Sequence, residues 1–127
     1  MPSKAAGPEM INVVVTRNQD KERNMSKVKM TTEEAFIKVL QMHGIDSAFG
    51  IIGSAMMPVT DLFPKAGITF WDCAHEFNGG MMADGFTRAS GKMSMLVGQN
   101  GPGIANFVTP VKVAYWNHTP LLLITAQ

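Results

Sequence analysis

The sequence predicts an α/β fold, with a parallel sheet that carries helices on both faces and is incomplete at its C-terminus. Short apolar stretches alternate with longer stretches of helical periodicity from residue 31 onward. Strands that alternate with helices form parallel sheets covered on both faces, and their crossovers are almost always right-handed. The last apolar stretch, "LLLITAQ", runs to the final residue. Because a last core strand normally leaves the core before a chain ends, we expect a fragment of a longer protein.

The first predicted helix has signals at both ends. Thr31 or Thr32 can cap it, because a hydroxyl oxygen accepts a hydrogen bond from a free amide of the first turn. Glu33 and Glu34 add negative charge where the helix dipole favours it. Gly44 follows the last turn, and glycine commonly ends helices.

The later elements alternate in type along the chain. They are a strand over 46–52, a short helix over 55–63, a strand over 67–74, a helix over 77–90, a strand over 92–99, a helix over 104–118 and a strand over 119–127. The helix over 77–90 carries a group of apolar residues on one side, namely Phe77, Met81, Met82, Phe86 and Ala89. The chain thus holds one domain over 31–127.

Residues 1–30 differ in composition from this domain. They mix Pro, Gly, Lys, Asn and Asp without sustained periodicity. Chain termini of this kind are commonly poorly ordered. We therefore predict a poorly ordered N-terminal extension over 1–30.

Charge, hydropathy and cysteine content exclude several classes of function. The net charge of +1 gives no sign of nucleic acid or of an anionic membrane surface as a partner. No apolar stretch reaches the length of about 18 residues that spans a bilayer, and the first residues do not form a secretory signal. The single cysteine, Cys73, cannot form an internal disulfide. We therefore expect a cytoplasmic protein in a reducing compartment.

Three turns follow predicted strands and precede predicted helices. They contain Gly53 with Ser54, His75 with Glu76, and residues 100–103. In open parallel sheets, ligands bind beyond the carboxyl ends of the strands. Glycines allow close backbone approach there, and helix N-termini direct free amides to the same edge. The sequence therefore predicts a cleft formed by these turns.

Glu76 has two interpretations from its position alone. It can be a functional carboxylate of the predicted cleft. Because it follows a buried strand and lies at a helix start, however, its position alone favours a helix-capping acid that the helix dipole stabilises by about 0.3–1 kcal/mol. His75 is most simply a hydrogen-bonded structural residue. The spacing of histidines, acids and the one cysteine predicts no metal site. A phosphate-binding glycine loop and a dinucleotide fingerprint are both absent, which disfavours a flavodoxin-like nucleotide binder.

Two long strings resemble a known family. They are "AHEFNGGMMADGFTRASGK" and "GQNGPGIANFVTPVKVAYWNHTPLLLIT", and they are similar to the pyrimidine-binding domain of the acetolactate synthase and pyruvate oxidase superfamily. The shared pattern is a His-Glu pair, a helix end of the form A-x-G-[FY]-x-R-A-[ST]-G, a strand, and then G-P-G-x-x-N. The strings "FGIIGSAMMP", "DLFPKAGITFWDCAHE" and "YWNHTPLL" resemble the sulfoacetaldehyde acetyltransferase branch of this superfamily.

The resemblance implies a thiamine diphosphate cofactor and gives Glu76 a catalytic role. In such enzymes a glutamate at this position bonds a ring nitrogen of the cofactor's aminopyrimidine, which promotes the imino tautomer that deprotonates the thiazolium carbon. A carboxyl group in a dry cleft makes a strong charge-assisted bond of this kind. The resemblance also implies that Ile52, Gly53, Asn100, Pro102 and Asn106 line the cofactor, and that His75 supports the turn at Glu76.

The resemblance further implies what this segment lacks. In the family, the diphosphate and Mg²⁺ are bound by a separate later domain, and each site lies between two subunits, so a homodimer or homotetramer is expected. The branch converts sulfoacetaldehyde and phosphate into acetyl phosphate and sulfite. Two alternatives stay open: an acetolactate-synthase-like enzyme that acts on 2-oxo acids, and a truncated module without catalytic activity.

Two residues depart from the family pattern. Gly79 stands where many members have alanine, which is expected to loosen the helix start by up to about 1 kcal/mol. Pro110 lies inside the predicted helix over 104–118, where a proline costs about 3 kcal/mol unless the helix bends.

Overall fold

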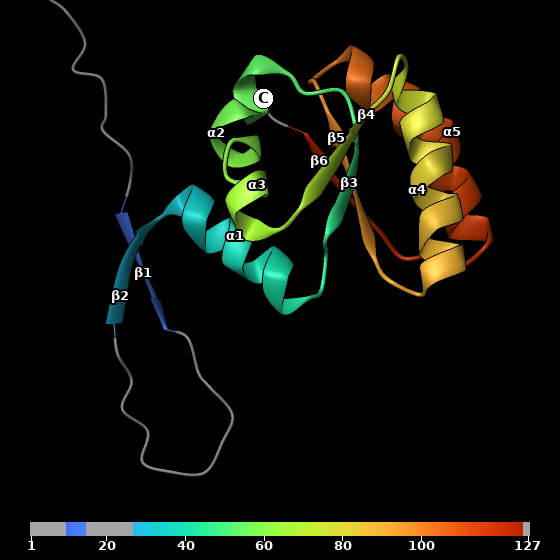
Figure 1. The fold of residues 1–127 in the computed structure, drawn as a ribbon. Helices are drawn as coiled ribbons and strands as arrows, with labels where there is room; N and C mark the ends of the chain where they lie inside the picture. The colour runs from blue at the N-terminus through green and yellow to red at the C-terminus, as the bar shows by residue number, and fades with distance from the viewer. Residues whose placement is uncertain (1–9, 15–26, 126–127) are drawn as a thin grey trace, which may run out of the picture.

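The structure is a computed structural model that describes residues 10–14 and 27–125 (Figure 1). In chain order, the elements are β1 (Met10–Val14), β2 (Lys27–Thr31), α1 (Thr32–Met42), β3 (Ser47–Gly50), η1 (Ser54–Met56), α2 (Met57–Thr60), α3 (Phe63–Ala66), β4 (Thr69–Asp72), α4 (Glu76–Ser90), β5 (Ser94–Gly98), α5 (Pro102–Trp116) and β6 (Leu121–Thr125).

A four-stranded sheet forms the centre of the molecule, with strand order β4-β3-β5-β6. All neighbouring strands in it are parallel. Helices α1, α2 and α3 lie on one face and α4 and α5 on the other, as Figure 1 shows. The predicted α/β fold, with helices on both faces of a parallel sheet, is confirmed.

Strand β5 shows why the apolar stretches are continuous. All five of its residues are buried, because helices cover both of its faces. Met95 and Val97 join the core beneath α1 and α3, together with Leu40. Leu96, between them, joins the core beneath α4 and α5. Successive side chains on a strand point to opposite faces, so one strand contributes to both cores.

Helix α1 begins at the predicted cap. The Thr31 Oγ1 accepts a hydrogen bond from the Glu34 amide at 3.2 Å, and Glu34 Oε2 accepts one from the Thr31 amide at 2.9 Å. This reciprocal capping box satisfies two backbone donors that the first turn leaves free. At the other end, Gly44 adopts a φ of 68°, which ends the helix as predicted.

The prediction of a single short helix over 55–63 is wrong. This stretch forms η1 and α2, and a separate helix α3 follows. Pro58 and Pro64 occupy first-turn positions of α2 and α3. Proline has no amide proton and is favoured where a helix begins, so each proline starts a new helix.

The segment over 1–30 contains regular structure that the sequence did not predict. Strands β1 and β2 pair antiparallel, with Met10 opposite Thr31 and Val14 opposite Lys27. The hairpin lies beside α1 and outside the four-stranded sheet (Figure 1). Residues 1–9 and 15–26 are outside the described residues, so the predicted poor order of the segment as a whole stays a prediction.

The apolar side of α4 is buried only in part, because Phe86 packs against the core whereas the residues nearer the helix start are exposed. Phe77, Met81 and Met82 are 39%, 38% and 43% exposed. The buried side consists of small and polar residues, namely Gly79, Gly80, Ala83, Asp84 and Thr87, after Glu76 at the helix start. Small residues let α4 approach the sheet and α5 closely.

Pro110 lies inside α5 and is buried. A methyl group added at Gly80 of α4 would lie 2.3 Å from the Pro110 Cβ. The missing side chain at Gly80 therefore makes room for the proline ring, and the two helices touch at this point.

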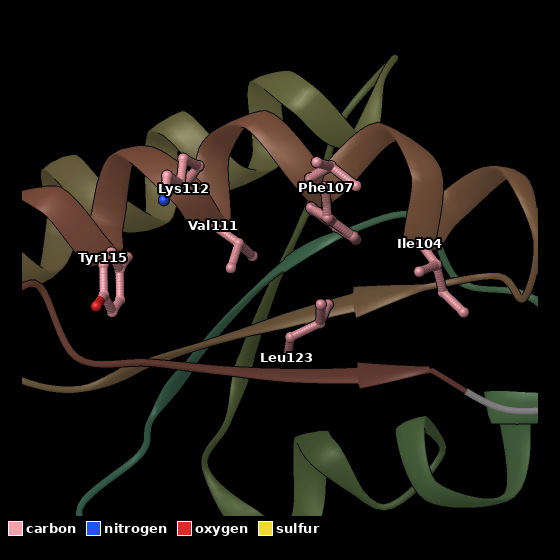
Figure 2. A pocket seen from close by; sticks show the side chains of 7 residues that line it. Ile104, Phe107, Val111, Lys112, Tyr115 and Leu123 are labelled. Atoms are coloured by element: carbon pink, nitrogen blue, oxygen red, sulfur yellow. The ribbon is translucent and has the colours of Figure 1, made fainter.

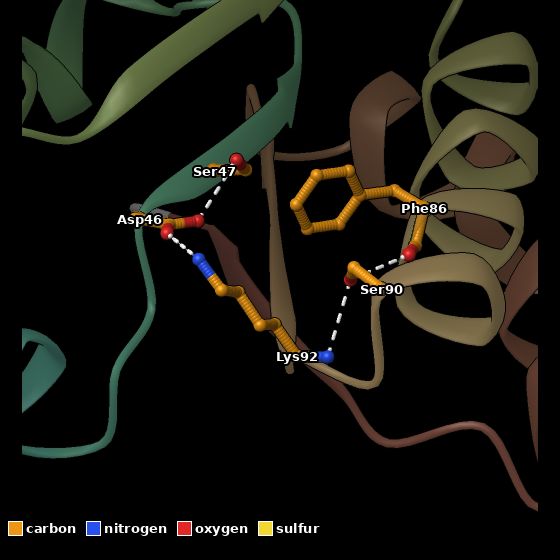
Figure 3. Close-up of polar contacts among 5 residues, drawn as sticks. All are labelled: Asp46, Ser47, Phe86, Ser90 and Lys92. Atoms are coloured by element: carbon orange, nitrogen blue, oxygen red, sulfur yellow. Dashed lines mark hydrogen bonds and ion pairs between the residues drawn. The ribbon is translucent and has the colours of Figure 1, made fainter.

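The amino ends of β3 and β5 are joined by polar contacts (Figure 3). Lys92 Nζ donates to Asp46 Oδ2, and this hydrogen bond holds the pKa of the Asp46 carboxyl below its usual value. Ser90 Oγ donates to the Phe86 carbonyl at 2.7 Å and accepts from the Lys92 amide at 3.1 Å. The contacts fix the connection from α4 into β5.

Candidate functional site

The carboxyl ends of β4, β3 and β5 lie side by side, because these strands are neighbours in the sheet. Backbone hydrogen bonds join the segments that leave them: the Ile51 amide donates to the Val97 carbonyl at 3.1 Å, and the Cys73 amide to the Gly50 carbonyl at 3.2 Å. The three predicted turns therefore meet at one edge of the sheet, as expected from the sequence.

Close backbone contacts at this edge depend on glycine. A methyl group at Gly50 would lie 1.9 Å from the Val97 carbonyl oxygen, and the φ of Gly50 is 141°. A methyl group at Gly79 would lie 3.2 Å from the Gly50 Cα and 2.8 Å from the Cys73 Sγ. Gly79 therefore does more than loosen the helix start, because it allows the start of α4 to contact the end of β3.

Glu76 is the first residue of α4 and is only 7% exposed. His75 caps the helix, since its Nδ1 accepts a hydrogen bond from the Phe77 amide at 3.1 Å. This contact requires an unprotonated Nδ1 and fixes the chain direction at Glu76. His75 thus supports the turn, as predicted.

The Glu76 carboxylate receives one side-chain hydrogen bond. Asn106 Nδ2, on α5, donates to Glu76 Oε2 at 2.8 Å. No other hydrogen bond reaches this carboxylate from residues 10–14 and 27–125. A methyl group at Gly103 would lie 3.5 Å from Glu76 Oε1, so the first turn of α5 borders the second oxygen. The carboxylate lies between the N-terminal turns of two helices.

The other predicted site residues lie at the same edge without bonding to Glu76. Ile52 is 41% exposed, and Asn100 and Pro102 are exposed in the turn that leads into α5. Gly53 is buried. Of the predicted set, the structure brings only Asn106 into hydrogen-bonding contact with Glu76.

Gln99 is a polar residue at this edge that sequence analysis missed. It follows β5 directly, and its Oε1 is buried with no hydrogen-bond partner among the described residues. A methyl group at Gly53 would lie 1.5 Å from this oxygen. The Gln99 amide therefore occupies the space that a side chain at Gly53 would need. Its position directly after a buried strand is the feature of the sequence that could have indicated a place at this edge.

Cys73 has a structural role at the same edge. Its Sγ donates to the Gly50 carbonyl at 3.1 Å, and burial raises the pKa of its thiol. A raised pKa disfavours the reactive thiolate, so the geometry gives no support for a cysteine nucleophile.

A groove that Glu76 does not line runs along α5. It is a hollow of about 490 Å³ between α5 and β6, lined by Ile104, Phe107, Val108, Val111, Lys112, Tyr115 and Leu123. Figure 2 shows side chains of α5 directed toward Leu123 across it. This lining is almost entirely apolar and contains no carboxylate, so we place the candidate site at Glu76 on chemical grounds.

Metal binding and membrane insertion find no support in the part of the chain that the structure describes. No three His, Cys, Asp or Glu side chains among the described residues lie where they could hold a metal ion. None of the helices there has the length and apolar character needed to cross a bilayer.

These features define the class of protein: an α/β domain with a parallel sheet and, at the start of a helix beyond the carboxyl ends of its strands, a buried glutamate. Residues 30–127 match the family model described as the thiamine pyrophosphate enzyme, N-terminal TPP binding domain. The chain belongs to this family, and the family resemblance of the sequence is confirmed.

Individual relatives agree with this assignment. The chain is 79% identical over 100 residues to a sulfoacetaldehyde acetyltransferase of Roseovarius nubinhibens and 74% identical over 100 residues to one of Rhodobacter capsulatus. Each match covers 79% of this chain and 17% of the relative. A solved thiamine diphosphate-dependent 4-hydroxybenzoylformate decarboxylase of Rhodococcus jostii superposes with a TM-score of 0.72 at 23% identity, over 77% of this chain and 18% of that one. The likeness to this decarboxylase concerns the fold alone.

Proposed function

We propose that this chain is the pyrimidine-binding part of a thiamine-diphosphate-dependent sulfoacetaldehyde acetyltransferase, with Glu76 as the residue that activates the cofactor. The observation that carries the proposal is the buried Glu76 carboxylate, held on one oxygen by Asn106 at 2.8 Å. The substrate class rests on the relatives with 74% and 79% identity, which carry that enzyme's name.

The residues present fit an aminopyrimidine ring. Glu76 Oε1 has no hydrogen-bond partner among the described residues and is bordered by the backbone of Gly103. A carboxylate oxygen of this kind can accept a hydrogen bond from a ring nitrogen that carries a proton, or share that proton. We propose that the ring lies at the edge formed by Ile52, Gly53, Asn100 and Pro102, next to Glu76.

When bound, thiamine diphosphate supplies a thiazolium carbon that becomes a nucleophile toward carbonyl groups. The role of this chain's own residues is narrower. Glu76 holds or moves a proton at the ring nitrogen, and its burial excludes water, which strengthens the hydrogen bond. From the family resemblance, we propose that Mg²⁺ and the diphosphate are bound by another domain.

We also propose that the protein assembles as a homodimer or homotetramer with the site between subunits. Large exposed apolar side chains on α4 and α5 support this proposal, namely Phe77, Met81, Met82, Val108, Tyr115 and Trp116. Contiguous exposed apolar surface commonly marks contact with another protein. We further propose that the substrate is a small molecule and that the protein is cytoplasmic. Cys73 is a free thiol, which is compatible with a reducing compartment.

Sulfite release from sulfoacetaldehyde tests the proposal. Protein expressed from its complete gene, with thiamine diphosphate, Mg²⁺ and phosphate, is expected to release sulfite and form acetyl phosphate. Production of acetolactate from pyruvate without sulfite release would instead assign the protein to the synthase branch. Failure to bind the cofactor in calorimetry would favour a module without catalytic activity.

The substitution Glu76→Gln tests the role of the carboxylate. Gln keeps the size of the side chain but cannot take up a proton, so activity is expected to fall by at least about a hundredfold. The proton at the thiazolium carbon should exchange with solvent correspondingly slowly, as measured by NMR. Glu33→Gln, in the first turn of α1, is the matched control and should leave activity unchanged. Normal proton exchange in Glu76→Gln would overturn the assigned role.

A further inference from the structure

We propose that Asn106 is a positioning residue for Glu76 and not a direct ligand of the cofactor. The inference rests on the proposed function and changes the role expected for Asn106 from the family resemblance. Its basis is the hydrogen bond from Asn106 Nδ2 to Glu76 Oε2 at 2.8 Å, which joins two helices across 30 positions of the chain.

The hydrogen bond from Asn106 fixes the orientation of the Glu76 carboxylate. Asn106 is partly buried and Glu76 is buried, so the contact is poorly screened by solvent. The bond occupies Oε2 and restrains rotation of the carboxylate. Oε1, which no described side chain contacts by a hydrogen bond, is therefore presented to a ligand in one orientation.

The packing of α4 against α5 sets the distance that Asn106 must span. Gly80 lies four positions after Glu76 on α4, and Pro110 lies four positions after Asn106 on α5. These two residues touch, since a methyl group at Gly80 would lie 2.3 Å from the Pro110 Cβ. The polar pair therefore lies one helical turn from a close apolar contact between the same helices.

Pro110 also affects the backbone at Asn106. Proline has no amide proton, so the bond that residue 110 would donate to the carbonyl four positions earlier is missing. That carbonyl belongs to Asn106. Helix α5 thus has one backbone hydrogen bond fewer at Asn106. We infer that the contacts of α5 with Gly80 and Glu76 fix the position of Asn106.

The variant Asn106→Leu removes the donor at nearly constant volume. In the protein expressed from its complete gene, the proton at the thiazolium carbon of bound thiamine diphosphate is expected to exchange about ten- to a hundredfold more slowly, the usual effect of losing a hydrogen bond to a charged group. The dissociation constant for thiamine diphosphate with Mg²⁺, measured by calorimetry, should change less than about threefold, because binding contacts remain. Asn117→Leu, at the exposed far end of α5, is the control.

A second variant separates positioning from a general structural role. Asn106→Asp cannot donate while ionised and brings a second negative charge to Glu76, but its protonated form donates again. Proton exchange at the thiazolium carbon should therefore recover in this variant as pH falls, whereas Asn106→Leu should show no such recovery. In the cofactor-free protein, the carboxyl carbon resonance of Glu76 should move in Asn106→Leu and stay unchanged in Asn117→Leu.

The outcomes are distinguishable. A loss of cofactor affinity of tenfold or more in Asn106→Leu, with normal exchange in the bound state, would make Asn106 a direct ligand. An unchanged Glu76 resonance together with normal exchange would also overturn the inference. Wild-type protein that does not bind thiamine diphosphate overturns the proposed function first and removes the basis for this role.

Discussion

The two ends of the sheet use glycine for different reasons. At the amino end, Gly44, Gly67 and Gly91 have φ values of 68°, 74° and 73°, and a methyl group at any of them would meet no atom within 4 Å. At the carboxyl end, methyl groups at Gly50, Gly79 and Gly103 would lie within 3.2 Å of neighbouring atoms. Glycines of the first set allow a left-handed backbone conformation. Those of the second set allow neighbouring segments to approach each other closely.

This difference separates the amino end of the sheet, where turns connect helices to strands, from the carboxyl end, where the candidate site lies. Turns at the amino end need a left-handed backbone, which asparagine can also adopt. Backbones at the carboxyl end pack against each other near Glu76, so a methyl group at Gly50, Gly79 or Gly103 displaces a neighbour, whereas Gly101 in the same region has a φ of 69° and free space. Substitution should therefore be tolerated at one end and harmful at the other.

The largest effect is expected for Gly50→Ala. Its methyl group would lie 1.9 Å from the Val97 carbonyl oxygen, and its φ of 141° is unfavourable for alanine. Because the obstacle is backbone, we expect a loss of more than about 3 kcal/mol in the free energy of unfolding, or no folding. Gly44→Asn, at the other end, should lose less than about 1 kcal/mol. Urea unfolding measures the free energy of unfolding of both variants. Equal losses in the two would contradict the proposed difference between the two ends of the sheet.

A smaller effect is expected where the obstacle is a side chain. Gly80→Ala would force the Pro110 ring away from α4, at a cost of about 1–3 kcal/mol, as is usual for overpacking. Gly85→Ala is the matched control on the same helix, because a methyl group there meets nothing within 4 Å. It should be neutral or stabilise by up to about 1 kcal/mol. In thermal unfolding, the melting temperature should fall in Gly80→Ala and should stay unchanged or rise in Gly85→Ala if the helix contact is as described.

The smallest effect is expected at the amino end, for Asp46→Asn. The hydrogen bond from Lys92 lowers the pKa of Asp46 in the folded state. The ionised Asp46 therefore stabilises the fold at pH values above its unfolded-state pKa, and this contribution is lost as pH falls through the folded-state pKa. Because the Asp46 side chain is 41% exposed, we expect a loss of at most about 1 kcal/mol at neutral pH. Wild type and variant should converge in acid and in high salt. Asp61→Asn serves as the control, and a difference that persists in acid would contradict this account.

Sequence analysis predicted the features that depend on local pattern. Capping at Thr31, the alternation of strands and helices, and the meeting of three turns at one edge all follow from residues close together in the chain. The two prolines that divide the stretch after β3 were visible and could have been interpreted as helix starts. The place of Glu76 after a strand and at a helix start is visible in the sequence, whereas its catalytic role follows only from the family resemblance.

Features that depend on distant partners could not be predicted. Gly79 suggested a loosened helix start, whereas Gly79 and Gly80 allow close contact with Gly50 and Pro110 from other elements. The exposure of Phe77, Met81 and Met82 on α4 could not be predicted, because hydrophobic periodicity does not distinguish burial within one chain from surface available to a partner. The bond between Asn106 and Glu76 depends on how α4 and α5 are placed, which no local pattern contains.

The contact between Gly53 and Gln99 has a consequence for sequence variation. Since the tip of Gln99 fills the space beside Gly53, a larger residue at position 53 would displace that flexible tip, with the backbone left in place. Tolerance at position 53 thus depends on what occupies position 99. Natural variation at these two positions is therefore expected to be epistatic, with a shorter residue at 99 arising before any side chain at 53.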